Sequence, residues 1–258
     1  MNLAEYREIT ENSEMTPEDH AFILGLLSIH KPAKILEIGV CAGGTTNLLL
    51  QALPKEATLF SVDIEKQYPR DRSKLTGYVA ERHYDERTQA RWVRYFGYDI
   101  ASCIAEIGHG VDFTIIDTTH VLPGEFLSFL AAFPYMSDGS VLVLHDIANH
   151  ALHKMLLPNP SEYQKNEFCT TLLFSAVFSR EKLMSEAAVP NCGAIVLDKK
   201  MVMDNIFMVM NMLFMPWLLM PNARILGETM KIVKEFYPAR DADLLEKAIQ
   251  YNLREKRG

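Results

Sequence analysis

Residues 34–50 read KILEIGVCAGGTTNLLL: a short apolar run ends in a glutamate and a glycine-rich turn, and a second apolar stretch follows. The first run is rich in aliphatic residues and predicts a buried strand, whereas the stretch after the glycines predicts a helix. A strand that passes through glycines into a helix is a common place for a backbone to enclose a small molecule.

The same alternation of apolar runs and helical patterns continues along the chain, which predicts βαβ units. Two later runs, TLLFSAVFS (171–179) and CGAIVLD (192–198), predict an antiparallel pair of edge strands. The expected fold class is therefore α/β, a Rossmann-like doubly wound, mostly parallel sheet with an antiparallel edge. The other predicted strands cover residues 58–64, 90–99, 111–117 and 139–147, and the predicted helices cover 18–30, 43–53, 100–108 and 124–136.

We expect a core domain over residues 1–200, with two additions inside it. Residues 1–30 predict a helical cap, because Thr16 and Pro17 are typical of a helix start. The charged, tyrosine-containing insertion 65–89 lacks a clean apolar period, and we interpret it as a lid.

Residues 201–258 predict a helical extension that begins with a methionine-rich stretch, MVMDNIFMVMNMLFMPWLLM at 201–220. Polar residues and Pro216 interrupt that stretch, so no apolar run reaches the roughly 18–20 residues of a membrane span. Its seven methionines offer adaptable packing. We expect these helices to pack on the core or to form the interface of a homo-oligomer, such as a dimer.

The charge and the cysteines limit the class of partner and the location. A net charge of −7 argues against nucleic acid as a partner, because phosphate neutralisation needs a basic face. The four cysteines lie far apart without a CxxC pair, and the N-terminus is polar and acidic rather than a secretory signal. A cytoplasmic protein with reduced thiols is expected.

The glycine turn itself limits the ligand. A dinucleotide-binding GxGxxG turn needs a second glycine where this chain has Cys41, and no Lys-Ser/Thr follows to form a phosphate-binding loop. Glu37 at the strand end suits a ligand with an ammonium group, and Asp63 at the end of the second strand suits the two hydroxyls of a ribose. An amine and a ribose without phosphate describe S-adenosylmethionine.

Four motifs stand in register: ILEIGVCAGGTT (35–46), FSVDIE (60–65), VDFTIIDTTH (111–120) and GSVLVLHDI (139–147). Together they resemble class I S-adenosylmethionine-dependent methyltransferases. Within that class the chain is similar to small-molecule O-methyltransferases of the catechol O-methyltransferase type, and to the branch of cephalosporin-hydroxylase-like proteins and macrolide O-methyltransferases. The resemblance implies a cofactor site made of Glu37, Gly39, Val40, Cys41, Gly43, Thr45, Asp63, Ile64, Tyr98, Asp99 and Asp117.

The fourth and fifth strands end in groups that could activate an acceptor hydroxyl, which must lose its proton to a base or to a metal. The resemblance implies a divalent metal, Mg²⁺ or Mn²⁺, on Asp117, His145 and Asp146, although the family's usual asparagine is replaced here by Ile147. The alternative has no metal and uses His120 or His145 as the general base. His120 is the first choice, because it occupies the position of the basic lysine in the catechol-type enzymes.

The expected activity is methylation of a hydroxyl on a small molecule, such as a sugar or a secondary metabolite, with His120, His145 and Asp146 as catalytic residues. Two alternatives remain open from the sequence. One is a non-catalytic module of the same fold that binds S-adenosylmethionine, and the other is a metal-dependent relative of the hydroxylase type.

Overall fold

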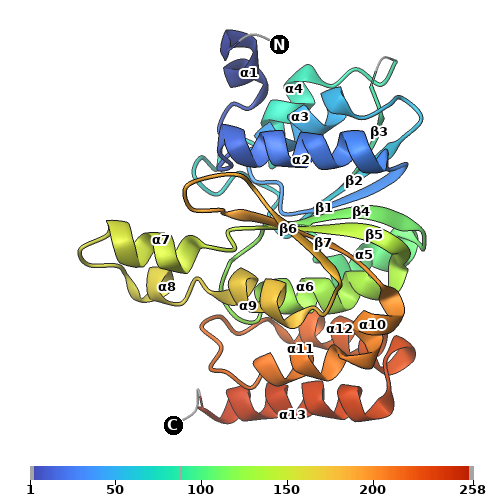
Figure 1. Ribbon diagram of the computed structural model, residues 1–258, viewed down its shortest axis with the longest axis vertical. Helices are drawn as coiled ribbons and strands as arrows, with labels where there is room; N and C mark the ends of the chain where they lie inside the picture. Colours follow the sequence, from blue (N-terminus) through green and yellow to red (C-terminus); the bar gives the residue numbers. More distant parts are fainter. Residues whose placement is uncertain (1–2, 88, 256–258) are drawn as a thin grey trace.

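The computed structural model describes residues 3–87 and 89–255. Residues 1–2 of the predicted cap, Thr88 of the predicted lid and residues 256–258 of the predicted extension lie outside the described residues. A sheet of seven strands divides the molecule, with helices on both of its faces (Figure 1). This is the predicted fold class, and it is confirmed.

The sheet has the strand order β3-β2-β1-β4-β5-β7-β6. The first five of these strands are parallel, β7 runs antiparallel to β5, and β6 runs antiparallel to β7. The order reverses between β1 and β4, and ligands bind at such a reversal, at the carboxyl ends of the strands. The strands are β1 Lys34–Ile38, β2 Thr58–Asp63, β3 Arg91–Phe96, β4 Val111–Ile116, β5 Met136–His145, β6 Glu181–Met184 and β7 Cys192–Val196.

Successive side chains of the central strands enter two different hydrophobic clusters, because strand side chains alternate between the faces of a sheet. Val141 and Val143 of β5 belong to one cluster, whereas Leu142 and Leu144 belong to the other. The first face is covered by α2 (Pro17–His30), α3 (Gly44–Ala52) and α4 (Tyr78–His83). The second is covered by α5 (Ile100–Ile107), α6 (Gly124–Ala132) and α9 (Cys169–Ala176) (Figure 1).

The first long helix begins where its sequence predicts. The Thr16 hydroxyl accepts a hydrogen bond from the Asp19 backbone N–H, and the Asp19 carboxylate accepts one from the Thr16 backbone N–H. Pro17 occupies the first helical position. Such a capping box satisfies N–H groups that would otherwise lack partners at the helix start.

One predicted edge strand is wrong. Residues 171–179 were expected to be a strand, but most of them belong to helix α9, and the outer strand is β6. The buried positions of α9 include Cys169, Leu173 and Ala176, a spacing of three to four residues that places them on one helical face. That face packs against α6, β5 and α11 (Ile206–Met212), so tertiary packing favours a helix in a run whose composition also suits a strand.

The C-terminal extension forms a further helical layer below α5 and α6 (Figure 1). Its methionine-rich part buries Ile206, Met210 and Trp217 in the same cluster as the second face of the sheet. No helix among the described residues is long and apolar enough to cross a membrane. The extension comprises α10 Lys199–Asp204, α11 Ile206–Met212, α12 Ala223–Phe236 and α13 Ala239–Glu255, and the remaining helices are α1 Leu3–Ile9, α7 Asn149–Leu156, α8 Glu162–Lys165 and the 3₁₀ turn Phe133–Tyr135.

Candidate active site

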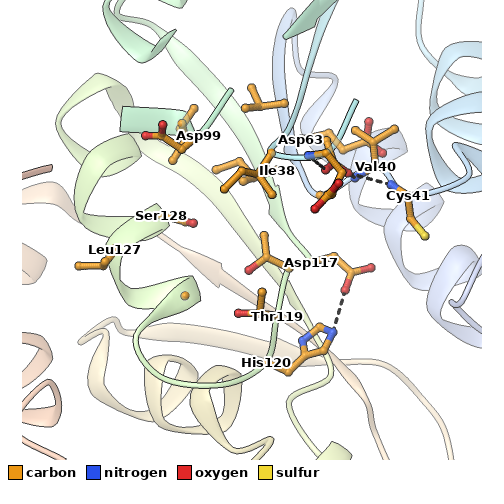
Figure 2. Close-up of a pocket in the computed structure, with 18 of the residues that line it drawn as sticks. Ile38, Val40, Cys41, Asp63, Asp99, Asp117, Thr119, His120, Leu127 and Ser128 are labelled. Atoms are coloured by element: carbon orange, nitrogen blue, oxygen red, sulfur yellow. Dashed lines mark hydrogen bonds and ion pairs between the residues drawn. The ribbon is translucent and has the colours of Figure 1, made fainter. Parts of the chain in front are cut away.

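A cavity of about 700 Å³ lies at the carboxyl ends of β1, β2 and β4, at the reversal of strand order (Figure 2). It collects most of the predicted cofactor residues from separate parts of the chain. Gly43, His145 and Asp146 do not line it. The predicted residues that do are Glu37, Gly39, Val40, Cys41, Thr45, Asp63, Ile64, Tyr98, Asp99, Asp117 and His120.

The glycines of the turn after β1 are required by close approaches of the chain to itself. Gly39 has φ +96°, and a Cβ there would fall 1.8 Å from the backbone oxygen of Asp117. Gly43 has φ +89°, and its Cβ would fall 2.7 Å from the Cα of Gly77. Both positions therefore exclude side chains for conformational and steric reasons. The loop at Gly77 packs against Gly43 because Gly43 has no side chain, and Gly43 does not contribute to the cavity wall.

Glu37 is a buried acid at the end of β1, only 2% exposed. Its carboxylate accepts hydrogen bonds from the Thr46 hydroxyl at 2.9 Å and from the Ser61 hydroxyl at 2.7 Å. Burial raises the pKa of Glu37 to about 7 despite these bonds, and the negative charges of Asp117 and Asp63 contribute. Among the described residues no basic side chain forms an ion pair with it, so the cavity has an acid without a cation.

Asp63 joins the end of β2 to the glycine turn. One of its carboxylate oxygens accepts hydrogen bonds from the backbone N–H groups of Val40 and Cys41, at 2.9 and 3.0 Å. The other oxygen accepts one from the Glu65 N–H at 2.8 Å. Each carboxylate oxygen has two acceptor sites, so the second oxygen keeps one for a ligand hydroxyl. Asp63 thus holds the turn and faces the cavity.

The end of the cavity near β3 is built by a polar helix start and half-exposed apolar side chains. Ile64 and Tyr98 are 54% and 48% exposed. Asp99 caps α5 by accepting a hydrogen bond from the Ser102 N–H, and its other carboxylate oxygen lies 3.0 Å from an amino group of Arg224.

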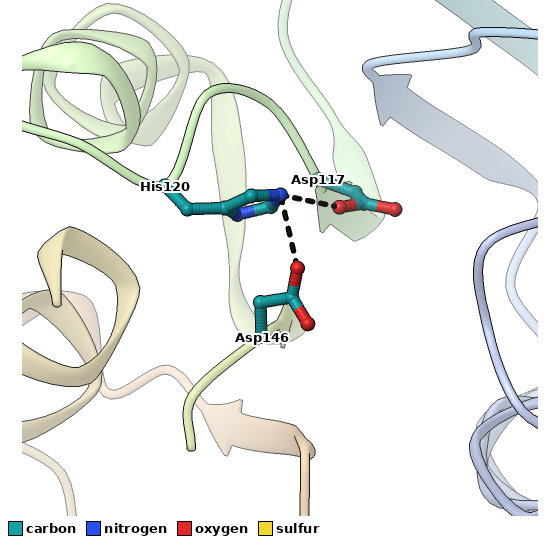
Figure 3. Close-up of side chains that lie close together, drawn as sticks. All are labelled: Asp117, His120 and Asp146. Atoms are coloured by element: carbon teal, nitrogen blue, oxygen red, sulfur yellow. Dashed lines mark ion pairs between the residues drawn. The ribbon is translucent and has the colours of Figure 1, made fainter. Parts of the chain in front are cut away.

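At the other side of the cavity two acids and a histidine meet (Figure 3). The Nε2 atom of His120 lies 3.0 Å from a carboxylate oxygen of Asp146 and 3.5 Å from one of Asp117. One ligand atom from each of the three residues lies within 4.8 Å of the others, which suits a divalent cation. His120 and Asp146 both have left-handed backbone angles, φ 57° and 61°. Such angles in residues other than glycine cost energy and often mark functional sites.

The predicted metal ligand His145 also lies near both carboxylates, and its Nδ1 atom is 3.7 Å from Asp146. His145 is the last residue of β5 and is 3% exposed, whereas Asp146 follows the strand. The Nδ1 atom of His145 lies 3.2 Å from Asp117, and its Nε2 atom lies 3.6 Å from Asp19. His145 therefore supports Asp117 from behind and does not line the cavity, and its role as a metal ligand or base stays a prediction.

The acids around His120 act on its charge. Burial alone would lower the pKa of His120, but the carboxylates of Glu125, Asp117 and Asp146 raise it above its usual value. The same carboxylates make this end of the cavity attractive to a cation. The role of His120 as the general base stays a prediction.

Two segments that the sequence analysis missed also line the cavity. Residues 12–15 cover it from the N-terminal side, where the Ser13 hydroxyl lies 2.9 Å from that of Thr45. Buried His20 contacts both hydroxyls, and burial lowers its pKa to about 4. Residues 219–222, Ile225 and Thr229 of the C-terminal extension cover the opposite side. Neither segment has a local motif, because tertiary packing alone brings it to the site.

Residues 36–147 match a family model described as a methyltransferase domain. No curated protein matches the chain in sequence. Residues 36–147 are therefore a methyltransferase domain, and their boundaries include the strand ends that form the cavity.

Solved structures of methyltransferases share the fold. The O-methyltransferase from Bacillus cereus in complex with S-adenosylhomocysteine is 16% identical, with a TM-score of 0.53 over 76% of this chain and 90% of that one. The O-methyltransferase TomG from Streptomyces achromogenes, involved in tomaymycin synthesis and bound to S-adenosylmethionine, is 15% identical, with a TM-score of 0.53 over 75% and 88%. The S-adenosylhomocysteine-bound methyltransferase PaMTH1 from Podospora anserina is 12% identical, with a TM-score of 0.55 over 76% and 88%.

At these identities the likeness establishes the fold, and the family match identifies residues 36–147 as a methyltransferase domain. The prediction of a class I methyltransferase is thereby confirmed.

Proposed function

We propose that this chain transfers the methyl group of S-adenosylmethionine to a hydroxyl oxygen of a small molecule. The observation that carries the proposal is the grouping of Glu37, Asp63 and Asp117 around one cavity, where Glu37 has no cationic partner among the described residues. S-adenosylmethionine brings an ammonium and a sulfonium into such a site, and both are attracted to carboxylates. A dinucleotide brings phosphates, which the same acids repel.

Each end of the cofactor finds a suitable group in this cavity. Glu37 would pair with the ammonium, and Asp63 would accept a hydrogen bond from a ribose hydroxyl with its remaining acceptor site. The cofactor's carboxylate suits the start of α3, whose N-cap Gly43 offers no side-chain cap, together with the Thr45 hydroxyl. Tyr98 and Asp99 would flank the adenine.

The acceptor side is proposed to be the cluster of Asp117, His120 and Asp146. These residues would hold a divalent cation, which when bound lowers the pKa of an acceptor hydroxyl. Two carboxylates and an imidazole suit Mn²⁺, Fe²⁺ or Zn²⁺ as well as Mg²⁺. Two further side chains hold the carboxylates in place: His145 lies against Asp117, and the Asn191 side-chain amide donates to Asp146 at 2.5 Å. Such supporting contacts orient ligands.

The names of the structural neighbours favour oxygen as the methylated atom, since those from Bacillus cereus and Streptomyces achromogenes are O-methyltransferases. The test is methyl transfer from tritiated S-adenosylmethionine to a panel of catechols, phenols and sugars, with Mg²⁺, Mn²⁺ or chelator. We expect transfer to at least one hydroxyl compound, and loss of that transfer in the Asp117→Asn variant. Transfer only to amines or thiols would contradict the proposal, as would full activity of the variant.

We further propose that the protein is a cytoplasmic homodimer joined through its C-terminal helices. Phe207 of α11 is 41% exposed, and Tyr251 and Leu253 of α13 are 42% and 37% exposed. Apolar side chains in such positions are suited to a subunit interface. The four cysteines are free, as suits a reducing compartment. Light scattering should give twice the chain mass, and an Asp substitution at Phe207 should halve it. A wild-type monomer would contradict this interface.

A further inference from the structure

We propose that residues 219–229 of the C-terminal extension form the outer wall of the nucleobase end of the cavity and thereby determine how tightly the cofactor is held. The inference rests on the proposed use of S-adenosylmethionine. The segment lies outside residues 36–147, so the matched methyltransferase domain does not contain this wall.

The cavity runs from the glycine turn after β1 toward α5 and α6. Figure 2 shows Cys41 and Asp63 at one side of the pocket and Asp99, Leu127 and Ser128 at the other. Asp99 stands at the start of α5, and Leu127 and Ser128 lie in the middle of α6. The cavity thus continues past the ribose position into the space above these two helices.

The C-terminal extension closes that space. Helix α12 packs against both α5 and α6, and this packing brings Ile225 and Thr229 to the cavity, with the loop 219–222 beside them. Ile225 is half-buried, and Thr229 is 1% exposed. An aliphatic side chain suits the flat apolar face of a purine, and the nearby Ser128 hydroxyl suits its polar edge.

An ion pair joins this wall to the strand ends. The Asp99 side chain is only 9% exposed, and its carboxylate lies 3.0 Å from Arg224 at the start of α12. Asp99 therefore couples the loop after β3, which flanks the cavity, to the helix that covers it.

The nucleobase and the acceptor lie toward different ends of the strand order. The acceptor must lie beside Asp117, His120 and Asp146, which follow β4 and β5. Asp99 follows β3, at the opposite edge of the parallel strands. A ligand whose ammonium meets Glu37 and whose ribose meets Asp63 extends along the edge of the sheet toward β3, so its base comes to lie beneath α12.

The experiment compares two neighbouring substitutions on the same helix. Ile225→Phe fills the cavity, whereas Leu226→Phe introduces the same ring at a side chain that packs on the hydrophobic core. Titration calorimetry with S-adenosylhomocysteine, and with adenosine alone, should give dissociation constants raised at least about tenfold in Ile225→Phe, which corresponds to about 1.4 kcal/mol. Leu226→Phe should stay within about threefold of wild type, with circular dichroism as the check on folding.

A second measurement needs no variant. Hydrogen exchange of wild-type protein should slow in residues 223–229 when adenosine binds, because the wall is then held in place. Equal affinities in the two variants, or exchange in this segment that adenosine leaves unchanged, would overturn the inference. So would an Ile225→Phe variant that raises only the KM for the acceptor. Failure of the proposed function is distinguishable, because wild-type protein itself would then bind neither nucleoside.

Discussion

Replacing Glu37 by glutamine tests whether the buried acid at the end of β1 binds a cationic group of the ligand. The side chains have the same shape, so the hydroxyl groups of Thr46 and Ser61 keep an acceptor while the charge is removed. Burial raises the pKa of Glu37 from its ordinary 4.5 to about 7. A change of this size corresponds to about 3 kcal/mol.

The sign of the effect follows from proton linkage. The folded protein holds the Glu37 proton more tightly than the unfolded chain does, so the stabilisation from this group is fully present below pH 4.5 and is lost as the pH rises to about 7. Between pH 4.5 and 8 the wild-type free energy of unfolding should therefore fall by about 3 kcal/mol more than that of Glu37→Gln. Urea unfolding at several pH values measures this difference.

Ligand binding should favour the charged form of Glu37, an effect that only the wild type can show. A cofactor ammonium beside Glu37 favours the charged carboxylate, so the affinity for S-adenosylhomocysteine should increase from pH 5.5 to 8 in wild type and stay level in Glu37→Gln. Glu228→Gln on α12 is the control, since it removes an acid without touching the cavity. Two results would refute the reasoning. One is a pair of parallel stability curves for wild type and Glu37→Gln, and the other is an affinity of Glu37→Gln at pH 8 equal to that of wild type.

Three further predictions concern the turn, the acid–histidine cluster and the first long helix. Gly43→Ala should lower the free energy of unfolding by about 2 kcal/mol, because its Cβ would clash at a positive φ. Gly227→Ala has open space inside α12 and should raise the free energy of unfolding by about 1 kcal/mol. Urea unfolding that ranks the two variants otherwise would disprove this. His120→Ala should weaken Mn²⁺ binding at least about tenfold in calorimetry, because a contact of the metal site is lost. His153→Ala should leave Mn²⁺ binding unchanged. Equal weakening in the two variants would count against the cluster. Asp19→Asn should lower the free energy of unfolding by about 2 kcal/mol, because it disturbs the capping box, and an unchanged thermal midpoint would speak against that role.

Local chemistry made much of the fold predictable from the sequence. The start of α2 follows from Thr16, Pro17 and Asp19, which lie within four residues of one another and satisfy the helix end themselves. The strand–glycine–helix unit at 34–52 is equally local, because Gly39 has a backbone angle that few other residues adopt.

Contacts between distant residues set the limit of prediction. The run 171–179 has a composition that suits a strand, and only its packing against α6, β5 and α11 favours a helix. The segment 219–229 reaches the cavity through the packing of α12 on α5 and α6, so no pattern near those residues indicates a site.

The acid–histidine cluster shows which parts of a site depend on backbone geometry. His145 and Asp146 are adjacent in sequence, but strand geometry turns His145 into the interior, while the left-handed backbone of Asp146 brings its carboxylate to His120. The sequence does not predict the left-handed backbone angle of Asp146, because glycine is the residue that usually adopts such an angle.

A crystal structure of the protein with S-adenosylhomocysteine tests the central claim most directly. The account predicts one ligand in the cavity, with its amino group at Glu37, its ribose hydroxyls at Asp63 and its base between Tyr98 and Ile225. A ligand bound elsewhere, or a ligand in the cavity whose amino group faces away from Glu37, would contradict it.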